Sequence, residues 1–373
     1  MRYRLIDNSL NNVNDILNTV LINRGISNPE AYMHLDDTCI DDYNNLDNID
    51  KAVECLMNHF ESGDNISVLV DCDPDGYTSA SMIYSYIKKQ NPNYPISYII
   101  HKSNKAHGLT KMDDGDIDIP TGTKLLVIPD AGTNDSEQCN NLIDSGVDIL
   151  IIDHHEQEEI GKDNKAIVVN NQISDNYKNK AFSGAGVMYE FLKALDDINW
   201  TTYADDYLDL VALAQVSDVM DLRSFPTRYY VNQGFRQIKN KMFEALINAQ
   251  DFSMKGKINP TTVAWNITPI LNSLIRIGSY EERELLFRAF IEDDEEFDYK
   301  KRTGEIIKEN IYDRAMRLCK NAKSRQDKMR DKLYAVLETE VDYNDQVVII
   351  VANASGPGII GLSSMKLADS IKR

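Results

Sequence analysis

Short apolar runs recur along the first half of the chain, and each leads directly into acidic residues. The run at 149–152 is followed by Asp153 and two histidines, and two earlier runs end at Asp71 and at Asp130. Short runs rich in β-branched residues are typical of strands that are buried on both faces of a sheet. The pattern therefore predicts buried strands with acidic side chains at their carboxyl ends.

Amphipathic segments separate these runs. Apolar residues at helical spacing predict helices at 49–60, 77–89 and 136–145, and further short strands are predicted at 96–100 and 168–171. Because strands alternate with helices, we predict an α/β fold with a doubly wound, mainly parallel sheet. Open sheets of this kind place their ligands beyond the carboxyl ends of the strands. The acidic side chains are therefore expected to meet at one edge.

The rest of the chain is predicted to be mainly helical. The pattern predicts helices at 182–195, 203–218 and 228–249, an extended segment at 262–269, one long helix at 298–333, a strand at 345–352 and a last helix from 356. One strand and one helix cannot bury a core alone, so we expect an incomplete second α/β lobe at the end. The expected organisation is a helical segment at 1–50, a sheet domain at 51–290, a long connecting helix at 291–340 and the incomplete lobe at 341–373.

Composition and charge narrow the class of protein. With 42% hydrophobic and 27% charged residues, the chain resembles ordinary soluble proteins. It has no apolar run of membrane-spanning length, no secretion signal and no paired cysteines among its five, so we expect a cytoplasmic protein without a membrane partner. The net charge of −19 argues against a nonspecific nucleic-acid coat. Residues 300–332 nevertheless carry twelve Lys/Arg against five Asp/Glu, which predicts either a solvated helix face or a nucleic-acid track.

The acidic residues also indicate what the sheet edge binds. Asp71, Asp73 and Asp75 alternate, so in an extended strand their side chains would face one side, and a turn at Pro74-Asp75-Gly76 would then spread them around one point. Carboxylates with imidazole, and no thiolate among them except Cys72, suit Mn²⁺ or Mg²⁺ better than a zinc-thiolate site. Two such ions about 3.5–4 Å apart are a common device for phosphoester hydrolysis. Of the adjacent His154 and His155, one could be a ligand while the other protonates the leaving oxygen.

In order along the chain, these residues resemble the motifs of the DHH phosphoesterase superfamily, and within it the RecJ single-strand exonucleases. The matching segments are Arg24-Gly-Ile, Asp71-Cys-Asp-Pro-Asp-Gly, Asp130-Ala-Gly, Asp153-His-His, Asn170-Asn-Gln, Val216-Ser-Asp, Pro269-Ile-Leu-Asn-Ser-Leu-Ile-Arg and Gly356-Pro-Gly-Ile-Ile-Gly. The chain differs from the family at His107, usually tyrosine, at Pro74, usually alanine, and at Ile270 and Ile275, usually arginine and glycine. The Gly356 motif opens the family's second domain, DHHA1, so the resemblance implies a truncated DHHA1 domain.

The resemblance implies a role for each matching residue. Two Mn²⁺ or Mg²⁺ ions would be held by Asp71, Asp73, Asp75, Asp130, His154 and Asp218. His155 would act as the acid or orient the phosphate, and Asp130 would bridge the ions. The implied substrate-binding residues are His107, Ser183, Gly184, Asn272 and Arg276.

The implied function is a two-metal phosphodiesterase that degrades single-stranded DNA from 5′ to 3′ in DNA repair, recombination or replication. A single-strand-binding protein or another replication or repair protein would be its partner. Two alternatives stay open. The Pro74-Asp75 pair favours a phosphodiesterase of short oligoribonucleotides or cyclic dinucleotides, and superfamily relatives that have lost their ligands act as non-catalytic replication or repair scaffolds.

Overall fold

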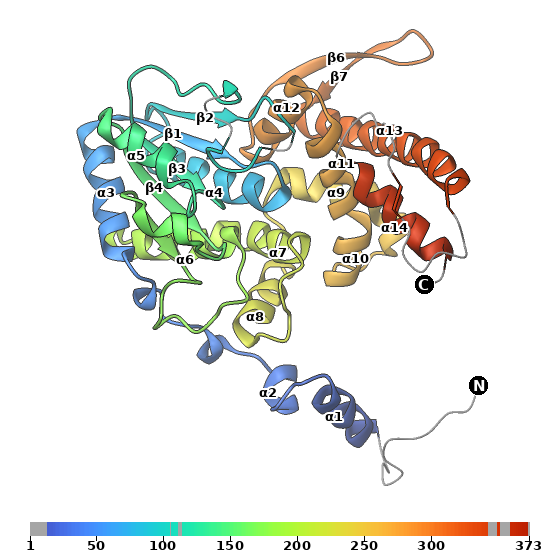
Figure 1. Cartoon of the computed structure of the whole chain (residues 1–373), viewed down its shortest axis with the longest axis horizontal. Coiled ribbons are helices and arrows are strands. Elements are labelled where there is room, and N and C mark those ends of the chain that lie inside the picture. The colour runs from blue at the N-terminus through green and yellow to red at the C-terminus, as the bar shows by residue number, and fades with distance from the viewer. Residues whose placement is uncertain (1–12, 105, 111–113, 342–348, 351–358, 372–373) are drawn as a thin grey trace.

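Five parallel strands form the central sheet of the protein. The computed structural model describes residues 13–104, 106–110, 114–341, 349–350 and 359–371 (Figure 1). The strands lie in the order β2-β1-β3-β4-β5. Their bounds are β1 Asn65–Val70, β2 Ile96–Ile100, β3 Thr123–Pro129, β4 Asp148–Asp153 and β5 Ile167–Asn170. The chain thus leaves β1 toward β2 on one side and returns to β3 on the other, which creates a topological switch point between β1 and β3.

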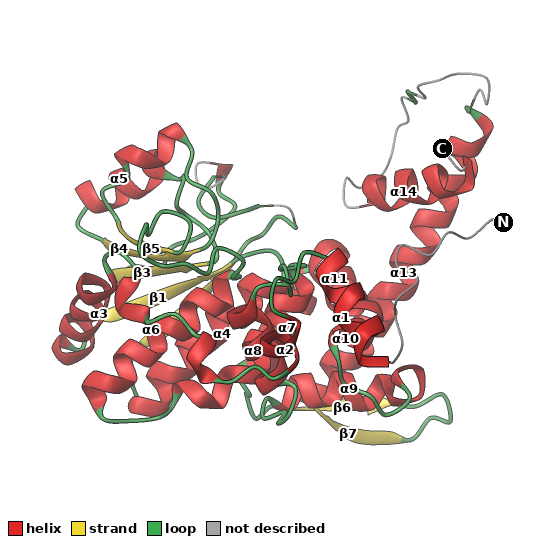
Figure 2. Cartoon of the chain, turned by 90° about the horizontal axis from the view of Figure 1, so that it is seen from below, coloured by secondary structure: helices red, strands yellow, loops and turns green. Residues whose placement is uncertain are grey.

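Helices cover both faces of this sheet, which confirms the predicted doubly wound α/β fold. Figure 2 shows α5 (Ser136–Asp144) on one face and α3 (Ile49–Ser62), α4 (Pro74–Gln90) and α6 (Gly184–Asn199) on the other. Successive strand residues point to opposite faces. In β1, for example, Val68 joins the larger core with α3, α4 and α6, whereas Leu69 joins the smaller core with α5.

The second half of the described chain is mainly helical. Its elements are α7 Leu208–Ser217, α8 Phe225–Gly234, α9 Lys241–Met254, α10 Pro260–Asn266, α11 Thr268–Ile277, α12 Tyr280–Phe290, β6 Glu296–Lys300, β7 Ile306–Asn310, α13 Ile311–Thr339 and α14 Ile360–Ile371. Arg283 joins α12 to the sheet, because its buried guanidinium donates hydrogen bonds to the carbonyls of His101, Lys102 and Ser103 just after β2. No helix of the described residues is long and apolar enough to cross a membrane.

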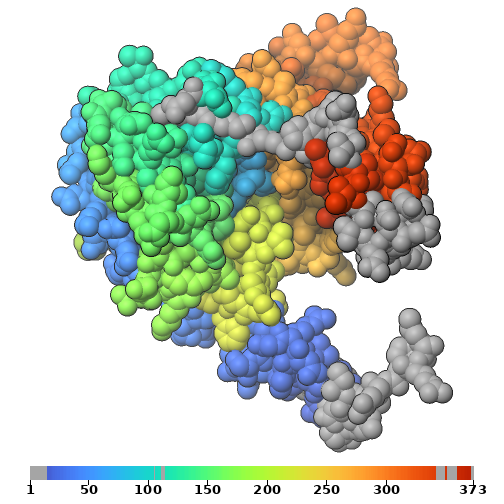
Figure 3. Space-filling view, viewed as in Figure 1, coloured from blue at the N-terminus to red at the C-terminus, as the bar shows by residue number. Residues whose placement is uncertain are grey.

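The N-terminal helices α1 (Val13–Asn23) and α2 (Pro29–Met33) stand out from the rounded body in Figure 3. Tyr32 connects these two helices to the body of the protein. Its hydroxyl donates a hydrogen bond to the Leu222 carbonyl at 3.2 Å, and the Arg228 guanidinium lies 4.1 Å from its ring centroid. These contacts place the N-terminal segment beside the loop that follows α7.

Two predicted elements are wrong in the C-terminal half. The segment at 262–269 is not extended, because α10 begins after a capping box. In this box the Asn259 side chain accepts a hydrogen bond from the Thr262 amide, and the Thr262 hydroxyl accepts one from the Asn259 amide. The helix predicted at 298–333 begins only at Ile311, since β6 and β7 form an antiparallel hairpin before it. The helical stretch at 228–249 is divided between α8 and α9. The strand predicted at 345–352 and the start of the Gly356 motif lie largely outside the described residues.

Glu190 provides a test of the core that is independent of function. This α6 residue is buried, and the hydroxyls of Tyr177 and Tyr230 both donate hydrogen bonds to its Oε1. Burial raises the pKa of Glu190 to about 7. Because the folded protein holds the proton more tightly than the unfolded chain, stability falls as the pH rises from the usual glutamate pKa to about 7.

We therefore expect Glu190→Gln to stabilise the protein at pH 8 by roughly 2–3 kcal/mol and to have little effect at pH 5. Denaturant unfolding at both pH values measures this difference. The exposed Glu61→Gln serves as the control. A Glu190→Gln variant less stable than wild type at pH 8 would contradict the assignment.

Candidate metal centre

Asp71, Asp73 and Asp75 lie in a strand-to-helix turn rather than in an extended strand. β1 ends at Val70, and Asp73 is the N-cap of α4, where its carboxylate accepts a hydrogen bond from the Gly76 amide at 2.9 Å. Asp75 lies in the first helical turn. The predicted alternation on one strand face is therefore wrong. The three carboxylates are instead gathered by the tight turn at the carboxyl end of β1.

Two glycines allow the chain to close around this turn. A Cβ on Gly76 would lie 2.6 Å from the Asp71 Cβ, so a larger residue would push α4 away from β1. At the start of α6, a Cβ on Gly184 would lie 2.4 Å from the Asp130 Oδ1. Both positions require glycine, because the Asp71 backbone lies close to Gly76 and the Asp130 side chain lies close to Gly184.

The N-terminus of α6 holds Asp75. The carboxylate accepts hydrogen bonds from the amides of Gly184 and Ala185, each at 2.8 Å, and from the Ser183 hydroxyl at 3.2 Å. Helix N-termini offer amide donors to a carboxylate, so this arrangement fixes the position of the Asp75 side chain in the interior. Ser183 and Gly184, predicted to bind substrate, thus contact Asp75 in the structure.

Asp130 follows β3 and is the most constrained acid of the group. Its φ of 62° is in the left-handed region, and its amide donates to the Ile152 carbonyl at 2.8 Å. The carboxylate is buried, and no described group completes a hydrogen bond with Oδ1. Burial, followed by the charges of Asp75 and Asp73, raises the pKa of Asp130 well above its usual value. A buried acid without a hydrogen-bonding partner for one oxygen suggests a missing cation.

His154 lies among three of these carboxylates. Its Nε2 is 3.2 Å from the Asp130 Oδ1, 3.6 Å from the Asp218 Oδ2 and 3.7 Å from the Asp75 Oδ2. Burial lowers the pKa of His154 despite the nearby acids. The neutral imidazole is the form that binds metals, and Nε2 is the nitrogen that faces the carboxylates and would be the ligand atom.

Asp218 completes the group from the end of α7. It caps the C-terminus of α7, and burial, followed by the charges of Asp75 and Asp73, raises its pKa. Three sets of residues place ligand atoms within 4.8 Å of one another: Asp71, Asp73 and Asp130; Asp75, His154 and Asp218; and Asp130, His154 and His155. Asp130 and His154 each belong to two sets, so the sets are adjacent. All six predicted metal-site residues thus converge.

This donor set fits divalent cations. Its ligand atoms are carboxylate oxygens and an imidazole nitrogen, the preference of Mn²⁺ and Mg²⁺ sites in proteins. Among the described residues, no lysine or arginine forms an ion pair with Asp73, Asp75, Asp130 or Asp218. Like charges this close repel one another, and a bound cation would relieve the repulsion.

Asp153 positions its neighbours, a role that the sequence did not reveal. Its Oδ1 accepts hydrogen bonds from the amides of His154 and His155 and, at 2.8 Å, from the His155 Nδ1. Its Oδ2 accepts from the amide and hydroxyl of Thr133. Although burial opposes ionisation, the His155 hydrogen bond and charge hold the pKa of Asp153 well below its usual range. Asp153 therefore fixes the orientation of His155.

A second Asp–His pair lies beside the first. The His107 Nδ1 is hydrogen-bonded to the Asp71 Oδ2 at 2.8 Å, and the Gly108 amide donates to the other oxygen. Although burial works against the charged ring, the Asp71 hydrogen bond raises the pKa of His107 to about 9. Its ring centroid is 4.7 Å from that of His155, whose pKa is also raised by its hydrogen bond to Asp153 despite burial. The two partly exposed imidazoles form a rim beside the acidic cluster, and the hydrogen bond of each ring to a carboxylate favours its charged form.

His101 is a further residue that the sequence analysis missed. The side chain is buried after β2, and its Nδ1 is hydrogen-bonded to Asp116 at 2.6 Å. Its Nε2 points to the Asp71 Oδ1 at 3.8 Å, without a hydrogen bond to any described group. Only the fold brings this histidine to Asp71.

The remaining predicted substrate residues lie on α11. Asn272 is half-buried, and Arg276 is exposed one turn later on the same helical face. At the start of this helix, the Thr268 hydroxyl shares a hydrogen bond of 3.1 Å with Ser217, the neighbour of Asp218. The structure thus places α11 next to the metal-site residues without a direct contact from Arg276 to them.

Comparison with known proteins agrees with this geometry. Residues 65–215 match the family described as "DHH family, N-terminal domain". The chain is 37% identical over 381 aligned positions to the putative SPbeta prophage-derived single-strand DNA-specific exonuclease YorK of Bacillus subtilis (strain 168), covering 100% of this chain and 64% of that protein. It is 24% identical to the single-stranded-DNA-specific exonuclease RecJ of the same strain, covering 97% of this chain and 44% of RecJ. The chain therefore spans less than two thirds of the length of these relatives.

Solved structures show the same fold. RecJ of Thermus thermophilus in complex with Mn²⁺ superposes with a TM-score of 0.71 at 19% identity, covering 88% of this chain and 45% of that chain. The structure of an exonuclease RecJ bound to manganese gives a TM-score of 0.68 at 19% identity, covering 88% of this chain and 79% of that chain.

Proposed function

We propose that this chain, whose residues 65–215 match the DHH-family N-terminal domain, is a two-metal phosphodiesterase that degrades single-stranded DNA from the 5′ end. The observation that carries the proposal is the group of three adjacent ligand sets that Asp130 and His154 link, within an acidic cluster that no described lysine or arginine neutralises. The names of the relatives support the substrate class. The polarity follows the resemblance to the RecJ family.

Each residue of the site has a separate task in this proposal. Two Mn²⁺ or Mg²⁺ ions would be held by Asp71, Asp73, Asp75, Asp130, His154 and Asp218. Asp130 would contact both ions. When bound, such ions activate water and neutralise the charge that develops on the phosphate. His155, oriented by Asp153, lies at the edge of the cluster, where its ring can orient the phosphate or give a proton to the leaving oxygen. Arg276 and Asn272 would bind the strand farther along.

The test is a digestion series on single strands labelled at the 5′ or the 3′ end. We expect hydrolysis with Mn²⁺, no hydrolysis in EDTA, and recovery when Mn²⁺ is added in excess. The label released first gives the polarity. A protein that contains no stoichiometric metal and cleaves neither strand would instead support the scaffold alternative. Preference for a dinucleotide over a long strand would support the short-oligonucleotide alternative.

His107 is expected to contribute to binding of the substrate phosphate. Its imidazole is charged at neutral pH because of Asp71, and it lies beside His155 at the rim. A charge-assisted hydrogen bond contributes roughly 1.5–3 kcal/mol, so His107→Gln should raise KM about tenfold or more, with a smaller change in kcat. His107→Lys, which keeps a positive charge, should recover part of the loss. Equal KM values in wild type and His107→Gln would exclude this role.

We further propose that the protein acts in DNA repair, recombination or replication within the cytoplasm, together with a single-strand-binding protein or a similar partner. The support is the naming of its relatives as single-strand DNA-specific exonucleases. Pull-down from cell extract with the purified chain, followed by mass spectrometry, tests the partner.

A further inference from the structure

We propose that a hollow beside α10 binds a nucleobase and its phosphate, farther along the single strand whose end is cleaved at the metal centre. This inference rests on the proposed function, because it extends the substrate path beyond the catalytic site. The hollow lies where α9, α10, the start of α11 and α13 meet. We call it the α10 hollow.

The lining of the α10 hollow has the chemistry of a single-strand site. It measures about 450 Å³ and is lined by Ala249, Gln250, Trp265, Asn266, Pro269, Ile270, Lys320 and Lys323. It combines an indole, two amides and two lysines, and no carboxylate belongs to this described lining. Sites for single-stranded nucleic acid combine aromatic rings, on which bases stack, with cations that contact the backbone.

Trp265 is the key residue of this hollow. The side chain is 78% exposed, although tryptophan is among the side chains with most apolar surface to bury. α10 is held at its N-terminus by the Asn259–Thr262 capping box, so the helix that carries the indole is well fixed. A large aromatic surface on a fixed helix, with cations beside it, can stack a base at little cost in conformational freedom.

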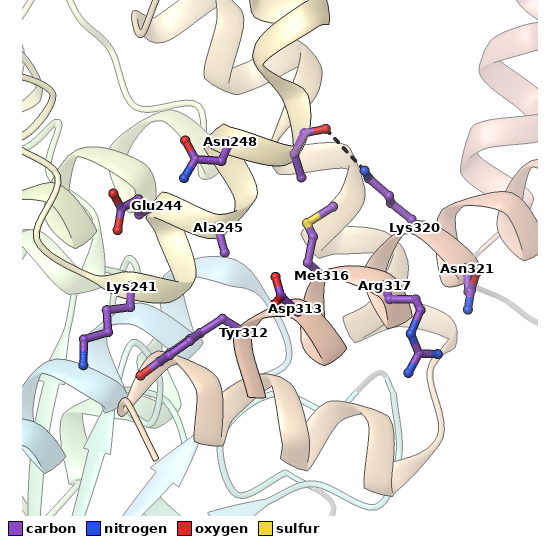
Figure 4. A pocket seen from close by; sticks show the side chains of 11 residues that line it. Lys241, Glu244, Ala245, Asn248, Tyr312, Asp313, Met316, Arg317, Lys320 and Asn321 are labelled. Atoms are coloured by element: carbon purple, nitrogen blue, oxygen red, sulfur yellow. Dashed lines mark hydrogen bonds between the residues drawn. The ribbon is translucent and has the colours of Figure 1, made fainter. Parts of the chain in front are cut away.

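The two lysines differ in how freely they can meet a phosphate. Lys323 pairs with Asp327 in a partly buried contact, and Asp327 also pairs with Arg330, so the ammonium of Lys323 is the less free of the two. Lys320 forms no ion pair with any described carboxylate, and Figure 4 shows its ammonium reaching the Ala249 carbonyl, at 3.3 Å. Helix α13 as a whole carries eight Lys/Arg against four Asp/Glu, in a chain with a net charge of −19.

The neighbouring hollow between α9 and α13 is a weaker candidate. It shares Ala249 and Lys320 with the α10 hollow, but Glu244 and Asp313 also line it (Figure 4). Its other cations, Lys241 and Arg317, pair with Glu292 and Glu309. The charged residues that line this hollow therefore favour a phosphate less than those that line the α10 hollow.

The position of the α10 hollow fits a strand that passes the metal centre. Pro269 and Ile270 in its lining belong to the first turn of α11. The adjacent Thr268 is hydrogen-bonded to Ser217, which precedes Asp218. α11 packs on α4, whose first turn carries Asp75, and α10 packs on α7, which is followed by Asp218. A strand could therefore reach Trp265 around the start of α11.

The two tryptophans of the chain, Trp200 and Trp265, permit a direct binding test. Trp200→Phe leaves Trp265 as the only indole, so base stacking on it can be followed by fluorescence. The titrant is a 20-residue oligothymidylate, in EDTA and again with Ca²⁺, which suits oxygen ligands. We expect the oligonucleotide to quench Trp265 and a thymidine dinucleotide to quench it much less. Quenching by a hexaglutamate peptide instead of the oligonucleotide would indicate an acidic protein partner and overturn the proposal.

The kinetic test uses matched variants with Mn²⁺. Stacking on one aromatic residue typically changes affinity by about five- to 150-fold, so Trp265→Ala should raise KM for the 20-mer roughly tenfold and leave dinucleotide cleavage unchanged. Phe252→Ala removes a 96% exposed ring that does not line the hollow and serves as the control. Lys320→Ala should reduce the salt dependence of 20-mer binding, whereas Lys328→Ala, an exposed lysine outside the lining, should change it less.

The outcomes separate this inference from the proposed function. If wild type cleaves DNA but Trp265→Ala equals Phe252→Ala on both substrates and Trp265 is not quenched, the α10 hollow is not a nucleic-acid site. If the oligonucleotide quenches Trp265 but no substrate is hydrolysed with Mn²⁺, the proposed activity fails and the binding site stands.

Discussion

Asp130→Asn is expected to lower the rate of hydrolysis at least about 1,000-fold, because contact with both ions would supply several kcal/mol of transition-state stabilisation. Asparagine is the informative replacement. The residue has a φ of 62°, a conformation that asparagine adopts more readily than alanine. The variant thus removes the charge with little change in the backbone.

The same substitution should reverse its effect on stability when metal is added. Burial and neighbouring acids raise the pKa of Asp130, so its ionised form destabilises the metal-free protein at pH values above the usual aspartate pKa. In EDTA at pH 8, Asp130→Asn should therefore unfold at a higher temperature than wild type. With Mn²⁺, ion binding stabilises wild type, and the order should invert.

Thermal unfolding of both proteins with and without Mn²⁺ measures this inversion. Asp118→Asn, which removes an exposed carboxylate, controls for net charge. If Mn²⁺ stabilises Asp130→Asn as much as it does wild type, Asp130 is not part of the metal centre.

Asp153→Asn should damage both stability and activity. The carboxylate accepts five hydrogen bonds from His154, His155 and Thr133. An amide has only one oxygen for these donors, and its NH₂ group would face the others. Hydrogen bonds to a buried charged group contribute about 1.5–3 kcal/mol each, so we expect a loss of about 3 kcal/mol or more. Because His155 would lose its orientation, kcat should fall about 100-fold.

Denaturant unfolding and steady-state kinetics with Mn²⁺ measure the two effects. Thr133→Val removes one of the five hydrogen bonds and should give an intermediate loss of stability. The exposed Asp163→Asn should have no effect on either quantity. Wild-type kinetics in Asp153→Asn would show that His155 needs no support from this carboxylate.

The strands and most metal-site residues could be predicted from the sequence because their signal is local. An apolar run predicts that β3 or β4 is buried inside the sheet. The residue that follows the run then lies at the carboxyl end of the strand, and this inference needs no information from the rest of the chain. The turn at Asp73 was harder to predict. Alternating acids suggested a strand, whereas Pro74 at the first helical position and the Asp73 cap were the better signals.

Two elements were misjudged because the local pattern was ambiguous. Thr262 and Val263 suggested an extended chain, but the preceding Asn259-Pro260 is a helix start and decides the outcome. In the β6–β7 hairpin, charged residues of high helix propensity hid the alternation of Phe297 and Tyr299. These rings are held by the guanidiniums of Arg314 and Arg317 on α13, at 4.4 and 4.3 Å from the ring centroids. Such a tertiary contact cannot be predicted from hairpin residues alone.

The residues that position the site could not be predicted either, because their contacts are formed between segments far apart in the sequence. His101 and Asp116 are paired only by the fold, and the role of Asp153 depends on Thr133 after a neighbouring strand. Sequence spacing shows that an acid ends a strand, but not whether its oxygens are free for a ligand or occupied by protein donors.

The order of the acids along the polypeptide has a consequence for the cell that makes the protein. Asp71 emerges early from the ribosome, whereas Asp218, at the end of α7, emerges only after the whole sheet has been synthesised. A partly translated chain therefore lacks Asp218, one of the candidate metal ligands. If the proposed function is right, hydrolysis would begin only in a molecule that has already folded through α7.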